Sequence, residues 1–121
     1  MDNSSTPAIS VYSDVGSGGV LAEAALTLLG RPYRLRDVRL LEDGAEATAE
    51  QRANHERLAR LNPMLQVPTL VIGGDEEDRG GQVLTESAAV LIALADLHPE
   101  AGLAPRPDAS ERAAFLRWMV Y

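Results

Sequence analysis

Two short stretches of this chain carry residue types suited to binding a small anionic molecule. In the first, Gln66 to Pro68, a proline opens an apolar, strand-like run. Proline cannot donate a ladder hydrogen bond, and X-Pro bonds are the ones in which a cis peptide costs little. A cis bond ahead of Pro68 would turn the N–H and C=O of Val67 outward, free to pair with an extended ligand. In the second, Thr85 to Ser87, an apolar helix begins, and its first N–H groups suit a carboxylate.

A third candidate is Ser17, which lies in the glycine-rich loop Gly16 to Gly19, just before another apolar helix. A hydroxyl beside a helix N-terminus can stabilise an anion, but a loop and helix cap would explain the same residues. The loop also suggests a dinucleotide fingerprint. That interpretation fails because Leu21 occupies the place of the third glycine.

Composition excludes several kinds of chemistry. The chain has 121 residues, a net charge of −7, no cysteine and two histidines, and all 11 of its basic residues are arginine. Disulfides, a thiol nucleophile and Schiff-base chemistry are therefore absent, and two histidines do not predict a metal site. The negative charge disfavours nucleic acid and anionic membranes. No apolar run approaches the roughly 18 residues that span a membrane, and a cytoplasmic location is the default expectation.

The acidic segment from Asp75 to Glu86 has the length of a calcium-binding loop. Glu77 and Arg79 occupy positions that would need aspartate or asparagine, so we reject a calcium site. We expect the range 73–81 to form a long hairpin whose acidic tip is solvated.

Periodicity and breakers predict an α/β fold. The predicted elements follow in the order strand, helix, strand, helix, strand, strand and helix. This βαβ-α-ββα order predicts a four-stranded mixed sheet with helices on both sides, the thioredoxin-like arrangement. The expected strands are 8–12, 33–41, 69–72 and 82–84, and the expected helices are 20–29, 46–61, 86–97 and 109–121. Thr85 is the expected N-cap of the third helix, and Asp108 that of the last.

Four stretches in this order and spacing resemble a known family. They are Val11-Tyr12-Ser13 leading to Ser17, Gly30-Arg31-Pro32-Tyr33, Asn62-Pro63-Met64 with Gln66-Val67-Pro68-Thr69-Leu70, and Leu84-Thr85-Glu86-Ser87. Together they resemble the N-terminal domain of glutathione S-transferases over roughly residues 8–98. The resemblance implies three parts: a glutathione-binding domain (1–98), a linker (99–107) and the first helix of an all-helical second domain (108–121). We therefore expect the chain to belong to a longer protein and to be weakly active or inactive by itself.

The resemblance also implies roles for the residues of the first two stretches, with glutathione as the cosubstrate. Val67 would pair its main chain with the cysteinyl part of the tripeptide, and Pro68 matches the family's cis-proline. Ser87 would hold the carboxylate of the γ-glutamyl head and Glu86 its ammonium group. Gln66 is similar to the residue that reaches the glycyl end.

Ser17 aligns with the catalytic serine of theta- and zeta-like members. In that role it stabilises the glutathione thiolate, which then attacks a small hydrophobic electrophile. Ser13 and Tyr12 are close enough in sequence to be alternatives for the thiol contact. The chain departs from the family pattern at two positions: Gly18 stands where beta-like members have cysteine, and Leu65 stands where glycine is usual.

The resemblance further implies a homodimer. Several functions stay open on these residues: a transferase, a glutathione-dependent isomerase or dehalogenase, or a non-catalytic binding or scaffold protein with the same fold. A thioredoxin-like oxidoreductase is disfavoured by the absence of cysteine.

Overall fold

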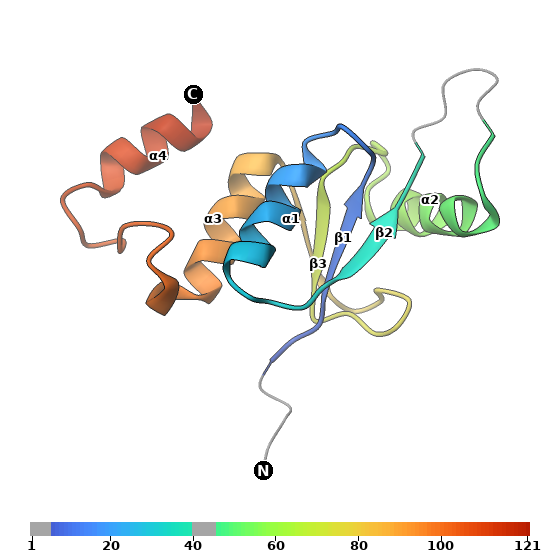
Figure 1. Cartoon of the computed structure of the whole chain (residues 1–121), viewed down its shortest axis with the longest axis horizontal. Helices are drawn as coiled ribbons and strands as arrows, with labels where there is room; N and C mark the ends of the chain where they lie inside the picture. Colours follow the sequence, from blue (N-terminus) through green and yellow to red (C-terminus); the bar gives the residue numbers. More distant parts are fainter. Residues whose placement is uncertain (1–5, 40–45) are drawn as a thin grey trace, which may run out of the picture.

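A computed structural model describes residues 6–39 and 46–121 of the chain. Its centre is a four-stranded sheet in the order β2-β1-β3-β4, in which β1 pairs in parallel with β2 and antiparallel with β3, and β3 pairs antiparallel with β4. The strands are β1 (Ile9–Ser13), β2 (Arg34–Asp37), β3 (Thr69–Ile72) and β4 (Gln82–Thr85). Helices α1 (Gly19–Leu28) and α3 (Ser87–Leu97) lie on one side of the sheet, and α2 (Ala49–Leu61) lies on the other (Figure 1). The predicted thioredoxin-like α/β fold is confirmed.

The sheet separates two apolar clusters because successive strand side chains point to opposite faces. On β1, Ile9 and Val11 belong to the cluster packed beneath α1 and α3. Tyr12 belongs to the cluster on the α2 side, together with Val38 and Leu58. All five side chains are at most 2% exposed, so the central strand is covered on both faces.

Most element boundaries lie close to their predicted positions. β1 is shifted by one residue, and β2 is shorter than the predicted range 33–41, the end of which lies outside the described residues. α2 starts at Ala49 because Thr48 and Gln51 form a reciprocal capping box. The predicted cap at Thr85 is wrong: Thr85 pairs with Thr69 as the last residue of β4, and Glu86 is the N-cap of α3.

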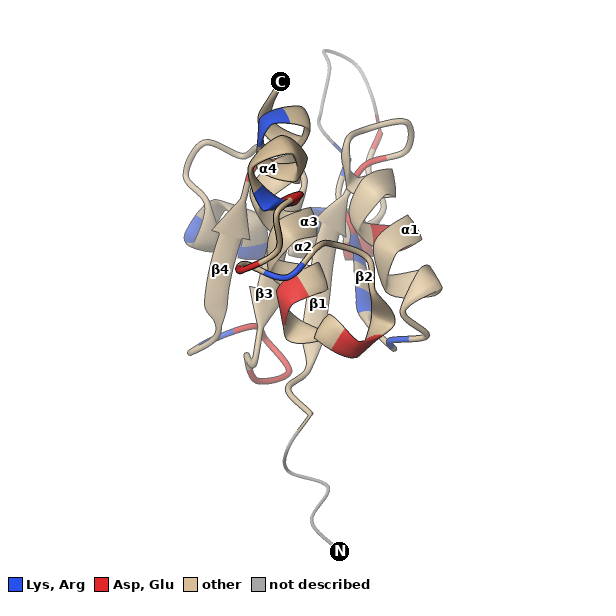
Figure 2. Cartoon of the chain, turned by 90° about the vertical axis from the view of Figure 1, so that its left-hand side faces the viewer, with Lys and Arg blue, Asp and Glu red and all other residues tan. Residues whose placement is uncertain are grey.

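The end of the chain leads away from the sheet to a separate helix. A short 3₁₀ turn, η1 (Pro99–Ala101), begins the predicted linker, and α4 (Arg112–Val120) follows it (Figures 1 and 2). The predicted cap at Asp108 is wrong, because α4 begins after Glu111 and Asp108 instead accepts a bond from Arg106. Arg112 joins α4 to α3 through an ion pair with Asp96, at 3.7 Å.

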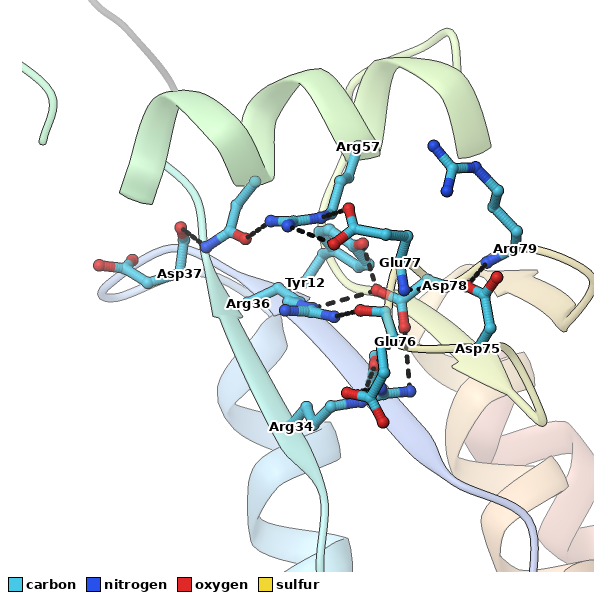
Figure 3. Close-up of polar contacts among 12 residues, drawn as sticks. Tyr12, Arg34, Arg36, Asp37, Arg57, Asp75, Glu76, Glu77, Asp78 and Arg79 are labelled. Atoms are coloured by element: carbon cyan, nitrogen blue, oxygen red, sulfur yellow. Dashed lines mark hydrogen bonds and ion pairs between the residues drawn. The ribbon is translucent and has the colours of Figure 1, made fainter. Parts of the chain in front are cut away.

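The loop between β3 and β4 is anchored by a buried carboxylate. Asp78 is 1% exposed and accepts hydrogen bonds from the hydroxyls of Ser10 and Tyr12, each at 2.5 Å. Arg34 and Arg36, both on β2, donate to its two oxygens at 3.2 and 3.1 Å (Figure 3). The prediction that the acidic segment would be a solvated tip is therefore wrong for Asp78. From the sequence alone, Asp78 cannot be distinguished from the three acidic residues that precede it.

Opposing effects act on the ionisation of Asp78. Burial disfavours its charge, but the hydrogen bonds from Ser10, Tyr12 and Arg36 outweigh burial and hold the pKa of Asp78 below its ordinary value. The neighbouring Glu77 is more exposed and pairs with Arg57 of α2 at 2.8 and 3.1 Å. The loop therefore ties β1, β2 and α2 together.

Replacing Asp78 tests how much this anchor contributes. Asp78→Asn should lower the free energy of unfolding by about 3–5 kcal/mol, because it leaves two partly buried arginines without their charge partner. Urea denaturation measures the loss. Glu76→Gln is the matched control, since Glu76 pairs with the same Arg34 but its side chain is 96% exposed. Equal effects of the two substitutions would contradict the buried-anchor interpretation.

The same carboxylate predicts a pH dependence of stability. Because the pKa of Asp78 is lowered on folding, its stabilisation is complete above the ordinary aspartate pKa of about 3.9. It is lost as the pH falls through the lower pKa of the folded protein. Acid unfolding followed by circular dichroism should therefore show a shallower acid limb in Asp78→Asn than in the unmodified protein. A limb of unchanged steepness would assign the acid sensitivity to other carboxylates.

Candidate functional site

A cleft of about 390 Å³ lies where β3 begins and β4 ends. It is lined by Ser17, Leu65, Gln66, Val67, Pro68, Thr85, Glu86 and Ser87. All six residues singled out from the sequence as site residues are among these eight. Three separate segments therefore meet in the cleft: the loop before α1, the loop before β3 and the start of α3.

The loop before β3 presents main-chain groups to the cleft. The Val67–Pro68 peptide bond is cis, and Leu65 has a positive φ of 55°, in the left-handed region that favours glycine. Within the part of the chain that the structure describes, the N–H and C=O of Val67 have no hydrogen-bond partner. An extended ligand could pair with both groups as an added strand does.

Asn62 holds this loop in shape from beneath. Its side-chain amide donates to the carbonyl of Gln66 at 3.3 Å and to the hydroxyl of Thr69 at 3.2 Å. Its side-chain carbonyl accepts from the N–H of Met64 at 3.1 Å, and the Thr69 hydroxyl donates to the Gln66 carbonyl at 2.9 Å. Asn62 and Thr69 are buried, so these contacts are shielded from water.

Sequence reasoning missed this pair as positioning residues. In the sequence, Asn62 stands out only as part of the Asn62-Pro63-Met64 stretch. An Asn-Pro step that follows a helix is itself a sign of a side-chain-stabilised turn, and it could have pointed to the role.

The start of α3 provides free donors beside a strained residue. Glu86, the N-cap, has φ 70° and ψ 122°, and its side chain forms no cap hydrogen bond. A non-glycine residue in such a conformation stores roughly 1–3 kcal/mol, and strain of this kind gathers at ligand sites. The first N–H groups of any helix lack intrahelical acceptors and carry partial positive charge, which suits a ligand carboxylate.

Ser17 closes the cleft from the side of α1. Its Oγ accepts hydrogen bonds from the N–H groups of Asp14 and Gly19, both at 3.2 Å. Among the described residues, its hydroxyl hydrogen has no acceptor, so the hydroxyl can donate to a ligand. Donors that bind the oxygen polarise the O–H bond and make it a better donor.

The two alternatives for the thiol contact lie elsewhere. Ser13 lines a separate cavity of about 410 Å³ on the β2 side of the same loop, bordered by Val15, Val20 and Leu35. Tyr12 is fully buried on the α2 side of the sheet and donates to Asp78. Burial and the neighbouring Asp78 carboxylate raise the pKa of Tyr12 well above its ordinary value, so Tyr12 stays a neutral core phenol.

The described residues include neither a cluster of metal-ligating side chains nor a membrane-spanning helix. Among residues 6–39 and 46–121, no three histidine, cysteine or acidic side chains gather closely enough to hold a metal ion. In the same ranges no helix combines the length and the apolar character that crossing a bilayer requires.

A thioredoxin-like domain with an anion-suited cleft at a cis-proline loop is the class of protein that the fold and the site define. The family model described as "Glutathione S-transferase, N-terminal domain" matches residues 22–97. The chain belongs to the glutathione S-transferase family.

The chain is similar to two curated proteins and to a solved structure of this family. An uncharacterized GST-like protein, YncG of Escherichia coli K12, is 35% identical over 113 residues, which are 93% of this chain and 48% of YncG. A probable maleylacetoacetate isomerase of Caenorhabditis elegans is 34% identical over 89 residues, 74% of this chain and 34% of the relative. The structure of a sphingomonad glutathione S-transferase complexed with glutathione superposes with a TM-score of 0.70 at 25% identity, covering 92% of this chain and 49% of that one. The chain thus spans half or less of the length of these relatives.

Proposed function

We propose that the protein binds glutathione in the cleft between Val67 and the start of α3 and activates its thiol with Ser17. The observation that carries the proposal is the convergence of three complementary groups on one cleft: an unpaired main-chain edge at Val67, free donors at the start of α3, and a polarised hydroxyl at Ser17. The glutathione bound in the sphingomonad relative supports this choice of ligand.

Each part of the tripeptide has a matching group in the cleft. Val67 would pair with the cysteinyl main chain. Ser87, the first residue of α3, would donate to the γ-glutamyl carboxylate, and Glu86 would accept from its ammonium group. Gln66, whose side chain is exposed at the rim, would reach the glycyl end.

Ser17 would stabilise the thiolate and would not itself act as a nucleophile. A free thiol has a pKa near 8.5, so little of it is ionised at pH 7. One hydrogen bond to a charged group contributes about 1.5–3 kcal/mol, and the dipole of α1 about 0.3–1 kcal/mol. Since one pKa unit corresponds to about 1.4 kcal/mol, these effects together would lower the thiol pKa by roughly one to three units.

The reaction that we propose is transfer of this thiolate to a small hydrophobic electrophile. The rest of the proposal follows the family: residues 1–98 form the glutathione-binding domain, 99–107 the linker, and 108–121 the first helix of a helical domain. A homodimer and a cytoplasmic location belong to the same proposal.

A glutathione-dependent isomerase is a second candidate, and the similarity to the probable maleylacetoacetate isomerase favours it. It would use the same thiolate with another substrate. Product analysis distinguishes the two functions, because a transferase consumes glutathione and an isomerase regenerates it.

Binding of glutathione is the first measurement. Isothermal titration of the full-length protein should give a dissociation constant between roughly 1 μM and 1 mM, the range typical of cosubstrates. Ultraviolet absorbance of the bound thiolate should reveal a thiol pKa below its value in free glutathione. Absence of heat and of stabilisation by glutathione would contradict the proposal and favour a scaffold protein.

Ser17→Ala tests the role of the hydroxyl. In the full-length protein, we expect the pKa of the bound glutathione thiol to rise by about one to two units and the conjugation rate at pH 6.5 to fall roughly 10–100-fold. The dissociation constant should change little. Ser13→Ala is the matched control, because Ser13 lines the other cavity, and its rate should stay near that of the unmodified protein. A full rate in Ser17→Ala would remove Ser17 from the mechanism.

A further inference from the structure

The start of α1 lies directly against the start of α3, and the contact point is a glycine. A Cβ atom placed on Gly18 would lie 3.1 Å from the Oγ of Ser87 and 3.4 Å from the Cδ of Pro68. The first of these distances is shorter than most real Cβ contacts, so a side chain here would require the Ser87 Oγ to shift by a few tenths of an ångström. Two of the three segments that form the cleft thus approach each other through the missing side chain of Gly18.

The backbone at Gly18 does not explain the glycine. Its φ of −60° and ψ of −13° lie in the right-handed helical region, which every L-residue adopts. By contrast, Gly16 has a φ of 76° and open space around it, so its backbone conformation favours glycine. At Gly18 it is the nearness of the Ser87 hydroxyl, and not φ or ψ, that a side chain would meet.

Gly18 is also the N-cap of α1, and the helix has no side-chain cap hydrogen bond. Glycine is itself among the preferred N-cap residues, only a few tenths of a kcal/mol less favourable than serine or asparagine. Helix capping therefore permits glycine at position 18 but does not by itself require it.

We propose that Gly18 is a positioning residue for the ligand site: its missing side chain leaves the Ser87 hydroxyl in place and open to the carboxylate of the ligand. This inference rests on the proposed function. Among the described residues, the Ser87 hydroxyl has no hydrogen-bond partner, so it is available to a ligand. A methyl group on residue 18 would push Ser87 Oγ aside by a few tenths of an ångström and cover it.

Gly18→Ala gives a direct test, because alanine readily adopts the right-handed helical backbone conformation of this residue. In the full-length protein we expect glutathione to bind roughly 10- to 150-fold more weakly, as for a lost hydrogen bond to a charged group. KM for glutathione should rise by the same factor, while kcat at saturating glutathione should change less than about twofold. Urea denaturation should show nearly unchanged folding.

A double-mutant cycle with Ser87→Ala separates this role from general damage to the site. Ser87→Ala removes the atom that the new methyl group would displace. In that background Gly18→Ala should change the dissociation constant by less than about twofold, since the two substitutions act on one interaction.

The outcomes divide the two hypotheses. If the unmodified protein binds glutathione and Gly18→Ala binds it equally well, the role of Gly18 is refuted and the proposed function stands. If Gly18→Ala weakens glutathione binding equally in the unmodified protein and in Ser87→Ala, the role of Gly18 is also refuted, because its effect would not depend on the Ser87 hydroxyl. If the unmodified protein does not bind glutathione, the proposed function itself falls, and this inference with it.

Discussion

The buried carboxylate of Asp78 is the interaction on which the arrangement of the sheet depends. It brings a hairpin loop, the central strand and the edge strand β2 to one point, and its charge is balanced by Arg34 and Arg36. The loop joins the end of β3 to the start of β4. The cleft lies at the other end of this strand pair, where β3 begins and β4 ends. Because β3 and β4 are paired over their full four-residue lengths, fixing the turn also fixes the register of the segments beyond Thr69 and Thr85. A charge cluster remote from the cleft thus helps to set its shape.

The elements were largely predictable because their signals are local. Helix periodicity, Pro63 after a helix, and the short apolar run of β3 are properties of neighbouring residues. The errors occurred where distant residues decide the outcome. Asp78 is indistinguishable from its acidic neighbours until Ser10 and Tyr12 are placed beside it. Thr85 has good cap chemistry, but pairing with Thr69 draws it into the strand.

The candidate site was also predictable in outline, because the resemblance named its residues and the structure gathers them around one cleft. What the sequence did not reveal was the support beneath them. The contacts of Asn62 and Thr69 depend on the path of the loop. The strain at Glu86 depends on its φ and ψ angles, which cannot be inferred from the residue type. The choice of Ser17 over Ser13 likewise depends on which side of one loop each hydroxyl occupies.

One part of the cleft that is offered to a ligand is main chain, namely the N–H and C=O of Val67, which are unpaired among the described residues. A peptide edge has the same donor and acceptor whichever side chain follows it. Substitutions can therefore accumulate around such an edge without altering what it recognises. A cleft that binds glutathione as proposed would therefore keep its ligand while the side chains around Val67 change.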